Sequence, residues 1–296
     1  MIKRTLFFSN NYHLSTENLQ LKAASKSNGE CKSVPIEDLG YVVFEHPQIT
    51  FTQSVMQLLA ENNTAVIFCD GKHRPSSMLL HLDTNYVQTE RFKLQLNAGE
   101  ALKKQLWKQT VKAKIANQAR LLDSLGLDGK ALFTKEKMVK SGDISNEEAK
   151  AARIYWRRLL GNQFLRDRFG DSPNPALNYG YAILRAAVAR ALAGSGLLAT
   201  LGIHHRNKYN SFCLADDIME PYRPFVDRLV YEMQEAGHDL SVLKTEEKMQ
   251  LLKVLSLDTQ TEDHTSPLQI ALSKTTYSLA LCFEGERRKI TYPEIF

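Results

Sequence analysis

The sequence has few cysteines and no long apolar run. Its four cysteines lie far apart and none forms a CxxC pair, so neither a zinc knuckle nor the dense disulfide framework of a small secreted domain is indicated. No run approaches the roughly 20 apolar residues of a membrane-spanning helix, and the N-terminal apolar stretch is too short for a signal peptide. We therefore expect free thiols, no membrane segment and a cytoplasmic location.

A large excess of charge of one sign is also missing. The 296 residues contain 38 Lys and Arg against 33 Asp and Glu, giving a formal net charge of +5 and a pI near 8.9. This balance permits a nucleic-acid partner without indicating one. With 43% hydrophobic residues the composition is that of a globular protein, and the length predicts one large or two medium domains.

The first ninety or so residues have the pattern of a β-rich domain. Short apolar runs at Thr5–Phe8, Gly40–Phe44 and Ala65–Cys69 are separated by turn sequences containing Asn and Gly, which is typical of strands. One helix is predicted among these strands, over Ser54–Ala60, because this segment is rich in helix-forming residues and ends at a polar Glu-Asn-Asn sequence.

From about Glu90 the pattern becomes helical, because apolar residues recur every three to four positions from Leu94 to Leu122. This long helix is predicted to end near residues 125–126, and the Lys-rich segment at 130–142 is predicted to be a loop. Further helices are expected at about 145–160, 176–193, 222–237, 245–255 and 265–274.

The change of pattern predicts an α+β protein with two domains. We place a β-rich domain at residues 1–88 and an α-helical domain at residues 89–296, with the boundary inside 82–90.

Basic residues dominate two segments of the helical part. The long helix carries Lys103, Lys104, Lys108, Lys112, Lys114 and Arg120, and a second cluster comprises Arg153, Arg157, Arg158, Arg166 and Arg168. Either these are solvated faces whose Lys stems cover apolar surface, or they bind phosphates along a nucleic-acid backbone. The second cluster favours DNA, and we predict DNA contacts at Lys108, Lys112, Lys114, Arg153, Arg157, Arg158 and Arg223.

Glu148 is the first candidate metal ligand. It shares a helix face with Ala152, Tyr155 and Leu159, and a carboxylate on an apolar stripe must be paired, hydrogen-bonded or bound to metal. The sequence Ser145-Asn146-Glu147-Glu148 also fits a capping box in which Glu148 bonds back to the helix start. Both interpretations of Glu148 remain open on this segment alone.

The residues between 202 and 224 concentrate further metal-ligand types. His204 and His205 precede Asp217 and Glu220, and the spacing of three places these two carboxylates on one side of a helical turn. Carboxylates with one imidazole suit Mg²⁺ or Mn²⁺. Alternatively, the histidines are structural, the aspartates at 216–217 cap a helix, and Glu220 pairs with Arg223. Considered together, the groups favour a metal-dependent phosphodiester site.

At this point the sequence resembles the CRISPR-associated spacer integrases (the Cas-one family), most of all those of type II systems. In the helical part the similarity rests on four segments: Glu148-Ala-Lys-Ala-Ala-Arg153-Ile-Tyr155-Trp156, Asn178-Tyr179-Gly180-Tyr181, Leu201-Gly202-Ile203-His204-His205 and Asp217-Ile-Met-Glu220-Pro221-Tyr222-Arg223-Pro224. In the β part it rests on residues 1–21, 38–46 and 65–75. The similarity therefore spans essentially the whole chain.

The resemblance implies a set of metal ligands. These fall on Glu148, His205 and Glu220, with Asp217 as an acidic neighbour that counts among the catalytic residues. Ala149 stands where family members commonly have Gly, but the Ala-Ala-Arg-x-Tyr pattern that follows fixes the assignment on Glu148. The spacing from Gly202 favours the second histidine of the doublet.

The resemblance also implies an architecture and partners. It implies an N-terminal β-sandwich involved in forming a homodimer, a larger helical lobe that holds Mg²⁺ or Mn²⁺, and a small CRISPR-associated subunit that bridges two dimers. The expected substrates are double-stranded DNA, both prespacer and CRISPR repeat, and the RNA-guided effector nuclease is an expected participant in choosing spacers.

The expected reaction is attack by the 3′-hydroxyl of a captured DNA on a phosphodiester of the repeat, and water in place of this hydroxyl gives endonuclease activity. Two other functions remain open: a DNA-binding scaffold without catalysis, and a metal-dependent phosphoesterase acting on small substrates. The basic segments argue against the phosphoesterase.

Overall fold

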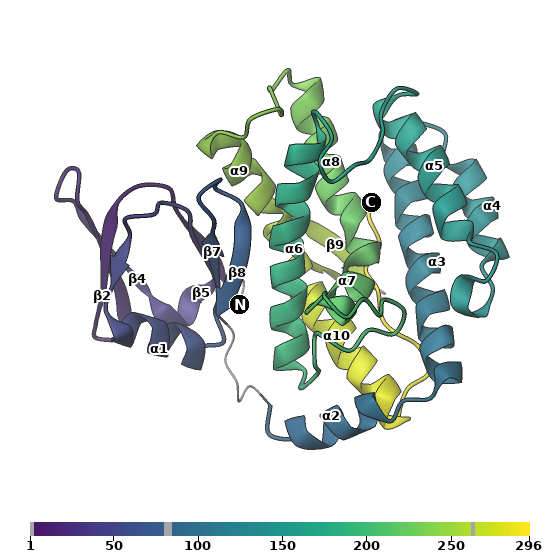
Figure 1. Ribbon diagram of the computed structural model, residues 1–296, viewed down its shortest axis with the longest axis horizontal. Coiled ribbons are helices and arrows are strands. Elements are labelled where there is room, and N and C mark those ends of the chain that lie inside the picture. The colour runs from purple at the N-terminus through teal and green to yellow at the C-terminus, as the bar shows by residue number, and fades with distance from the viewer. Residues whose placement is uncertain (1–2, 80–84, 262–263) are drawn as a thin grey trace. The chain divides into compact units, whose positions relative to one another are not determined.

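The structure is a computed structural model that describes residues 3–79, 85–261 and 264–296. It divides into two compact units, residues 1–84 and 85–296, each with its own buried apolar residues. Figure 1 shows the first unit as strands with one helix and the second as mostly helices. The predicted boundary segment at 82–90 lies partly outside the described residues.

Two four-stranded sheets form the first unit. One has the order β1 (Arg4–Phe8), β5 (Leu39–Phe44), β7 (Ala65–Cys69) and β8 (Pro75–Leu79), in which only the β7–β8 pair is antiparallel. The other has the order β4 (Cys31–Pro35), β3 (Gln20–Ser25), β2 (Tyr12–Glu17) and β6 (Thr50–Phe51). Helix α1 (Gln53–Glu61) and the short η1 turn (Ile36–Asp38) connect strands.

The sheets and α1 share one core. Leu14 of β2, Val42 of β5 and Leu59 of α1 belong to a single buried apolar cluster. Every residue of β5 is buried, as expected of a central strand covered on both faces. The prediction of an N-terminal sandwich is confirmed, and the three predicted strands correspond to β1, β5 and β7.

The second unit is helical apart from one hairpin. Its helices are α2 (Gln88–Leu96), α3 (Glu100–Ser124), α4 (Lys130–Met138), α5 (Glu147–Leu160), α6 (Asn174–Gly194), α7 (Cys213–Met219), α8 (Arg223–Glu235), α9 (Thr245–Leu252) and α10 (Leu268–Glu284). Short η turns lie at Ser141–Asp143 (η2), Glu220–Tyr222 (η3) and Lys253–Ser256 (η4), and the hairpin pairs β9 (Asp258–Thr261) with β10 (His264–Pro267). The hairpin was not predicted.

Helix α6 is the centre of this unit. It is buried along most of its length and contacts α7, α8, α9 and α10. Gly180 permits the approach of α8, because a Cβ at this position would lie 2.4 Å from a methyl carbon of Val226. Within the described residues, no helix is long and apolar enough to cross a membrane.

Two predictions about the helices were wrong. The long helical run is broken at residues 97–99, and Gly99 is the N-cap of α3. The Lys-rich segment predicted to be a loop contains α4, because Leu132 is fully buried and two charged residues of the segment pair with residues outside it. Lys135 lies 3.2 Å from Glu147, and Glu136 lies 2.7 Å from Lys112 of α3.

Candidate functional site

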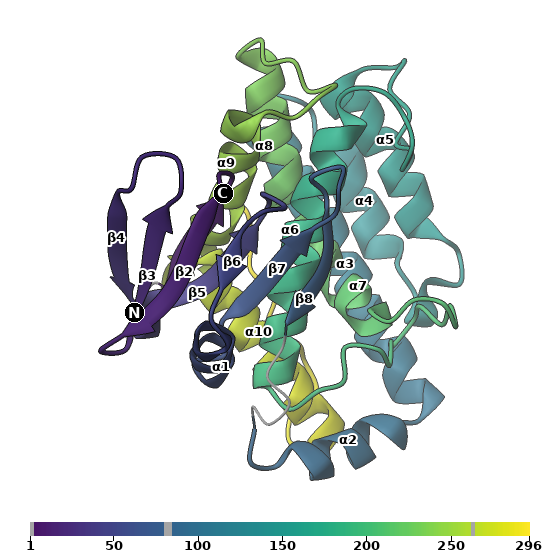
Figure 2. The ribbon, with the colours of Figure 1, turned by 60° about the vertical axis from the view of Figure 1, so that its left-hand side comes forward.

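The predicted ligands come from three segments of the helical unit. Glu148 is the second residue of α5, His205 lies in the loop between α6 and α7, and Glu220 begins the η3 turn after α7. Helix α3 contacts both α5 and η3, and it lies beside α5 in both ribbon views (Figure 1, Figure 2). The face of α3 that carries Lys114 therefore lies between the segments that carry the two carboxylates.

Glu148 does not cap its own helix. Helix α5 begins at Glu147 with Asn146 as N-cap, and no side-chain cap bond forms there. Instead the carboxylate of Asp143 accepts the backbone N–H groups of Glu147 and Glu148, at 2.9 and 3.0 Å. The capping-box interpretation of Glu148 is therefore wrong, and its carboxylate is available to the site.

The buried face of α5 shares Tyr155 and Leu159 with the predicted one but differs in its first two members. Glu147, Ala151, Tyr155 and Leu159 are its buried members, and Glu147 is only 1% exposed. Lys150 at 2.7 Å and Lys135 at 3.2 Å neutralise this carboxylate, and its pKa is lowered mainly by the hydrogen bond from Lys150. Glu147 is thus the carboxylate on the apolar stripe, while Glu148 projects from the neighbouring, partly exposed face.

The His-His doublet separates into two roles. His204 stacks on Trp107, with ring centroids 4.1 Å apart and ring planes nearly parallel. His205 instead has its Nδ1 2.6 Å from Oδ1 of Asp217, which also accepts the backbone N–H of His205. Because Asp217 accepts, Nδ1–H donates and Nε2 is left as the nitrogen able to bind an ion.

Asp217 fixes the loop that carries His205. Its side chain is fully buried, and its Oδ2 also accepts the backbone N–H groups of Ile203 and His204 at 2.7 and 2.9 Å. The hydrogen bond that His205 donates to Asp217 raises the pKa of His205, and the charge of Glu220 adds to this increase. Gly202 is required for the fit, because a Cβ there would lie 2.4 Å from the carbonyl oxygen of His205.

Glu220 is a buried carboxylate held by two cations. Its Oε1 accepts a 2.9 Å hydrogen bond from Nε of Arg223, and Oε2 lies 2.6 Å from Nζ of Lys114. Burial alone would raise the pKa of Glu220, but the charges of Arg223 and Lys114 outweigh it and lower the pKa to about 2. The predicted alternative pairing of Glu220 with Arg223 is therefore present.

Lys114 connects the two carboxylates. Its Nζ lies 2.5 Å from Oε1 of Glu148 and 2.6 Å from Oε2 of Glu220, and the side chain is only 10% exposed. Burial would lower the pKa of Lys114, but Glu220 and Glu148 outweigh that effect and raise it, so the amine is charged. Lys114 was predicted to contact DNA; its burial and its two internal partners instead make it part of the site.

The donor set suits a hard divalent cation. Glu148 and Glu220 already converge on one positively charged atom, and Oε2 of Glu220 is a buried oxygen without a well-directed hydrogen bond. Across residues 3–79, 85–261 and 264–296, no three His, Cys, Asp or Glu side chains enclose an ion. The carboxylate pair therefore fits a cation, and Nε2 of His205 is the nitrogen that would complete the donor set.

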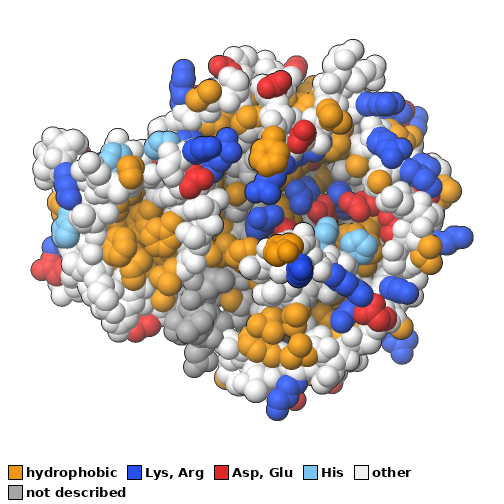
Figure 3. All heavy atoms as spheres, in the orientation of Figure 1, with side chains coloured by type: hydrophobic (Ala, Val, Ile, Leu, Met, Phe, Trp, Pro, Cys, Tyr) orange, Lys and Arg blue, Asp and Glu red, His pale blue; other side chains and the backbone are white. Residues whose placement is uncertain are grey.

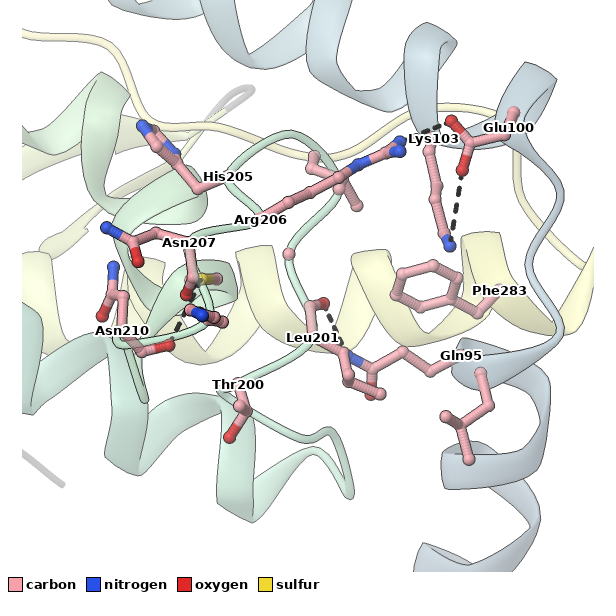
Figure 4. Close-up of a pocket in the computed structure, with 15 residues that line it drawn as sticks. Gln95, Glu100, Lys103, Thr200, Leu201, His205, Arg206, Asn207, Asn210 and Phe283 are labelled. Carbon is pink, nitrogen blue, oxygen red and sulfur yellow. Dashed lines mark hydrogen bonds and ion pairs between the residues drawn. The ribbon is translucent and has the colours of Figure 1, made fainter.

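A pocket of about 390 Å³ adjoins His205. Figure 4 shows that it lies between the loop 200–210 and residues of α2, α3 and α10. Nε2 of Gln95 holds the loop by donating to the carbonyl oxygens of Leu198 and Leu201, at 2.9 and 3.1 Å. Lys103, Arg206 and Lys208 line the pocket together with amide side chains, which suits a negatively charged or polar ligand.

The other predicted DNA contacts differ in exposure. Arg153 and Arg157 are exposed on α5, whereas Lys108 is half-buried. Lys112 pairs with Glu136 at 2.7 Å, and Arg158 pairs with Asp128 at 3.2 Å. Arg223 is held by Glu220 and lies over the ring of Tyr181, 4.5 Å from its centroid. On the face shown in Figure 3, Lys and Arg side chains surround a group of acidic and histidine side chains.

Two residues of the site were not predicted from the sequence. The roles of Lys114 and Asp143 depend on partners that only the fold brings close. One signal was present: Lys114 stands among Val111, Ile115 and Leu122 on a helix, and a lysine near apolar positions requires an internal partner.

The sequence is similar to a known protein family over most of its length. The family model described as CRISPR associated protein Cas1 matches residues 6–251. The CRISPR-associated endonuclease Cas1 of Neisseria meningitidis serogroup C (strain 8013) is 37% identical over 298 residues, which cover 100% of this chain and 97% of the relative.

Solved structures share the fold. A casposase bound to integration product superposes with a TM-score of 0.82 at 20% identity, covering 98% of this chain and 92% of that chain. A chain of a Cas6-RT-Cas1–Cas2 complex superposes with a TM-score of 0.74 at 19% identity, covering 99% of this chain and 36% of that one. At these identities the two likenesses establish the architecture only.

Proposed function

This chain belongs to the Cas1 family of CRISPR-associated proteins, and we propose that it is a metal-dependent DNA integrase and endonuclease of CRISPR adaptation. Its substrates in this proposal are captured double-stranded DNA and a CRISPR repeat. The Neisseria relative is an endonuclease by name, which supports endonuclease activity, and the casposase of the same fold is bound to integration product, which supports integration.

One observation carries the proposal. Two glutamates from different helical segments, Glu148 and Glu220, lie 2.5 and 2.6 Å from the same cationic nitrogen, beside an imidazole whose other nitrogen is fixed by Asp217. Burying two carboxylates together is costly unless a positive charge lies between them. Glutamates with a purely structural role could each pair with a separate cation. The convergence of Glu148 and Glu220 on one cation therefore favours a catalytic site that binds a cation.

We assign the metal to Glu148, Glu220 and Nε2 of His205, with Mg²⁺ or Mn²⁺ as the ion because the donors are two carboxylates and one imidazole. A divalent ion supplies Lewis-acid stabilisation of the charge that develops on phosphate oxygens. Asp217 is a positioning residue that holds the imidazole in the required orientation and tautomer.

The reaction is a balanced exchange of phosphodiester bonds. The 3′-oxygen of the captured DNA bonds to a phosphorus atom of the repeat, the bond to the leaving 3′-oxygen breaks, and one proton passes from the attacking hydroxyl to the leaving oxygen through solvent. Because no net bond energy is required, the protein contributes mainly by positioning the two DNA ends. With water as the nucleophile the same geometry gives strand cleavage.

The partners follow from the family. We propose that the chain forms a homodimer through its β-sandwich unit and that a small CRISPR-associated subunit bridges two dimers, with the RNA-guided effector nuclease taking part in spacer choice. The Cas1–Cas2 complex among the structural neighbours supports the bridging subunit. Exposed Arg153 and Arg157 are the proposed contacts to the DNA backbone, and the cytoplasm is the proposed location.

An integration assay tests the proposal. Supercoiled CRISPR plasmid, prespacer DNA and the purified partner subunit are incubated with Mg²⁺ or Mn²⁺, and joined products are measured. We expect wild-type protein to join DNA and Glu220→Gln to give none. Absence of joining and cutting by the wild type would favour a DNA-binding scaffold, whereas hydrolysis of mononucleotides with weak salt dependence would favour a small-substrate phosphoesterase.

A further inference from the structure

Lys114 lies where the two carboxylates meet. Its Nζ is within 2.6 Å of both Glu148 and Glu220, and the residue is 8% exposed although it belongs to a lysine-rich helix. Lys112, two positions earlier, has a more exposed side chain and pairs with Glu136 instead. Lys114 is therefore part of the cluster of carboxylates rather than of the basic surface.

The charges in this cluster balance without any bound ion. Glu148 and Glu220 carry two negative charges, and Lys114 and Arg223 carry two positive charges in direct contact with them. A divalent ion between the carboxylates would add two positive charges to a largely buried, neutral group, where like charges repel. One of the resident cations must withdraw for the ion to bind tightly.

Lys114 is the cation better able to move. Arg223 is a rigid planar group that bonds to Glu220 at 2.9 Å and also lies over the ring of Tyr181, 4.5 Å from its centroid. The ammonium of Lys114 is a point charge on a flexible four-carbon stem, and its two carboxylate partners are the proposed metal ligands. Loss of those partners to the ion removes what holds Nζ in place.

We propose that Lys114 is a displaceable internal counter-ion: its ammonium holds Glu148 and Glu220 together in the metal-free protein and leaves this position when a divalent ion binds. Metal and ammonium then compete for the same two carboxylates. This inference rests on the proposed function, because it takes Glu148 and Glu220 as metal ligands. It predicts that Lys114 limits metal affinity while stabilising the metal-free fold.

The first test measures Mn²⁺ binding and thermal unfolding of Lys114→Met, without DNA. Removing the competing charge should tighten Mn²⁺ binding about tenfold or more in calorimetry. The metal-free variant should unfold about 5–10 °C lower, because buried Glu220 and partly exposed Glu148 lose their shared cation, and Mn²⁺ should restore most of this loss. The control is Lys112→Met, which removes a half-buried ion pair away from both carboxylates and should change neither Mn²⁺ affinity nor the response to Mn²⁺.

The second test uses the wild-type protein, so it holds even if Lys114→Met fails to fold. Reductive methylation followed by peptide mass spectrometry reports the access of reagent to each lysine amine. We expect saturating Mn²⁺ to increase methylation of Lys114 severalfold and to leave that of Lys112 unchanged.

The outcomes separate the two proposals. Wild-type protein that binds no Mn²⁺ would overturn both the metal site and this inference. If the wild type binds Mn²⁺ but Lys114→Met binds it no more tightly, the inference is overturned and the metal site stands. The same conclusion follows if Mn²⁺ leaves the methylation of Lys114 unchanged.

Discussion

Two adjacent glutamates of α5 differ in what surrounds them. Glu147 is 1% exposed on the apolar face of the helix, between Lys135 and Lys150, and among the described residues no second carboxylate pairs with these two lysines. Glu148 lies on the next face, shares Lys114 with Glu220 and has His205 nearby, an imidazole whose side chain is 44% exposed. The more deeply buried carboxylate is the structural one. Convergence and access, rather than burial alone, identify the reactive site.

The largest expected loss of strand transfer comes from substituting Glu220 or His205. Glu220→Gln and His205→Ala should each lower strand transfer about 10³-fold or more, because residues acting around one ion lose function together. Circular dichroism and thermal unfolding serve as the fold control. Near-normal integration by either variant would remove that residue from the metal site.

The next effect concerns the support of His205. Asp217→Asn should lower metal affinity or activity about 10–100-fold, the usual cost of losing a carboxylate behind a metal-bound histidine. Gly202→Ala should act in the same direction, since its Cβ would displace the carbonyl of His205. Activity and Mn²⁺ affinity are measured for both variants. Values equal to those of the wild type would show that Asp217 and Gly202 do not position His205.

The stability of the protein should also depend on pH through another buried carboxylate, that of Asp227. Asp227 bonds to the hydroxyls of Tyr155 and Tyr181 rather than to a close cation, and burial raises its pKa to about 6 despite those bonds. Because the pKa of Asp227 is higher in the folded protein than in the unfolded chain, its protonated form favours folding. This contribution to stability is fully present below the unfolded pKa near 3.8 and is lost as the pH rises through about 6. Glu220 has the opposite sign, because its pKa is lowered to about 2 and its contribution is lost as the pH falls.

We therefore expect Asp227→Asn to remove a decrease in stability between pH 4 and pH 7, of roughly 2–3 kcal/mol by the size of the shift. Urea unfolding of wild type and variant across this range measures it. Parallel stability curves for the two proteins would show that Asp227 does not titrate there.

The smallest effect is expected at the surface. Charge reversal at Arg153 and Arg157 should weaken binding of unrelated duplexes alike and reduce the salt slope by about one for each phosphate that the protein no longer neutralises. Arg158→Glu is the matched control on the same helix, because Arg158 is paired with Asp128. A slope that stays unchanged in the double variant would place the DNA backbone elsewhere.

The sequence patterns predicted the positions of helices and strands along the chain better than the contacts that their side chains make. Three strands, α1 and most of the helices lie where periodicity placed them, because each pattern is local. The apolar face of α5 was predicted correctly at Tyr155 and Leu159 but wrongly in the first turns, where Glu147 and Ala151 are buried in place of Glu148 and Ala152. Helix α4 was missed because its lysines are paired with residues distant in sequence, such as Glu147.

The site residues were predicted from a resemblance rather than from a pattern. The residue pattern favoured a metal-dependent phosphodiester site, but it left Glu148 open between cap and ligand and Glu220 open between ligand and partner of Arg223; that last contact is present. The role of Lys114 could not be predicted, because its partner Glu148 lies 34 residues away and only the packing of α3 against α5 brings them together.

Strand transfer by Glu147→Gln and Glu148→Gln, measured side by side with the partner subunit present, tests the central claim most directly. Both substitutions remove one negative charge from adjacent residues of one helix. We predict that Glu148→Gln loses strand transfer and Mn²⁺ binding but keeps its melting temperature within a few degrees. Glu147→Gln should keep strand transfer and unfold at a lower temperature than the wild type, because Lys135 and Lys150 lose their charged partner. Loss of strand transfer in Glu147→Gln, with normal activity in Glu148→Gln, would contradict the assignment of the site.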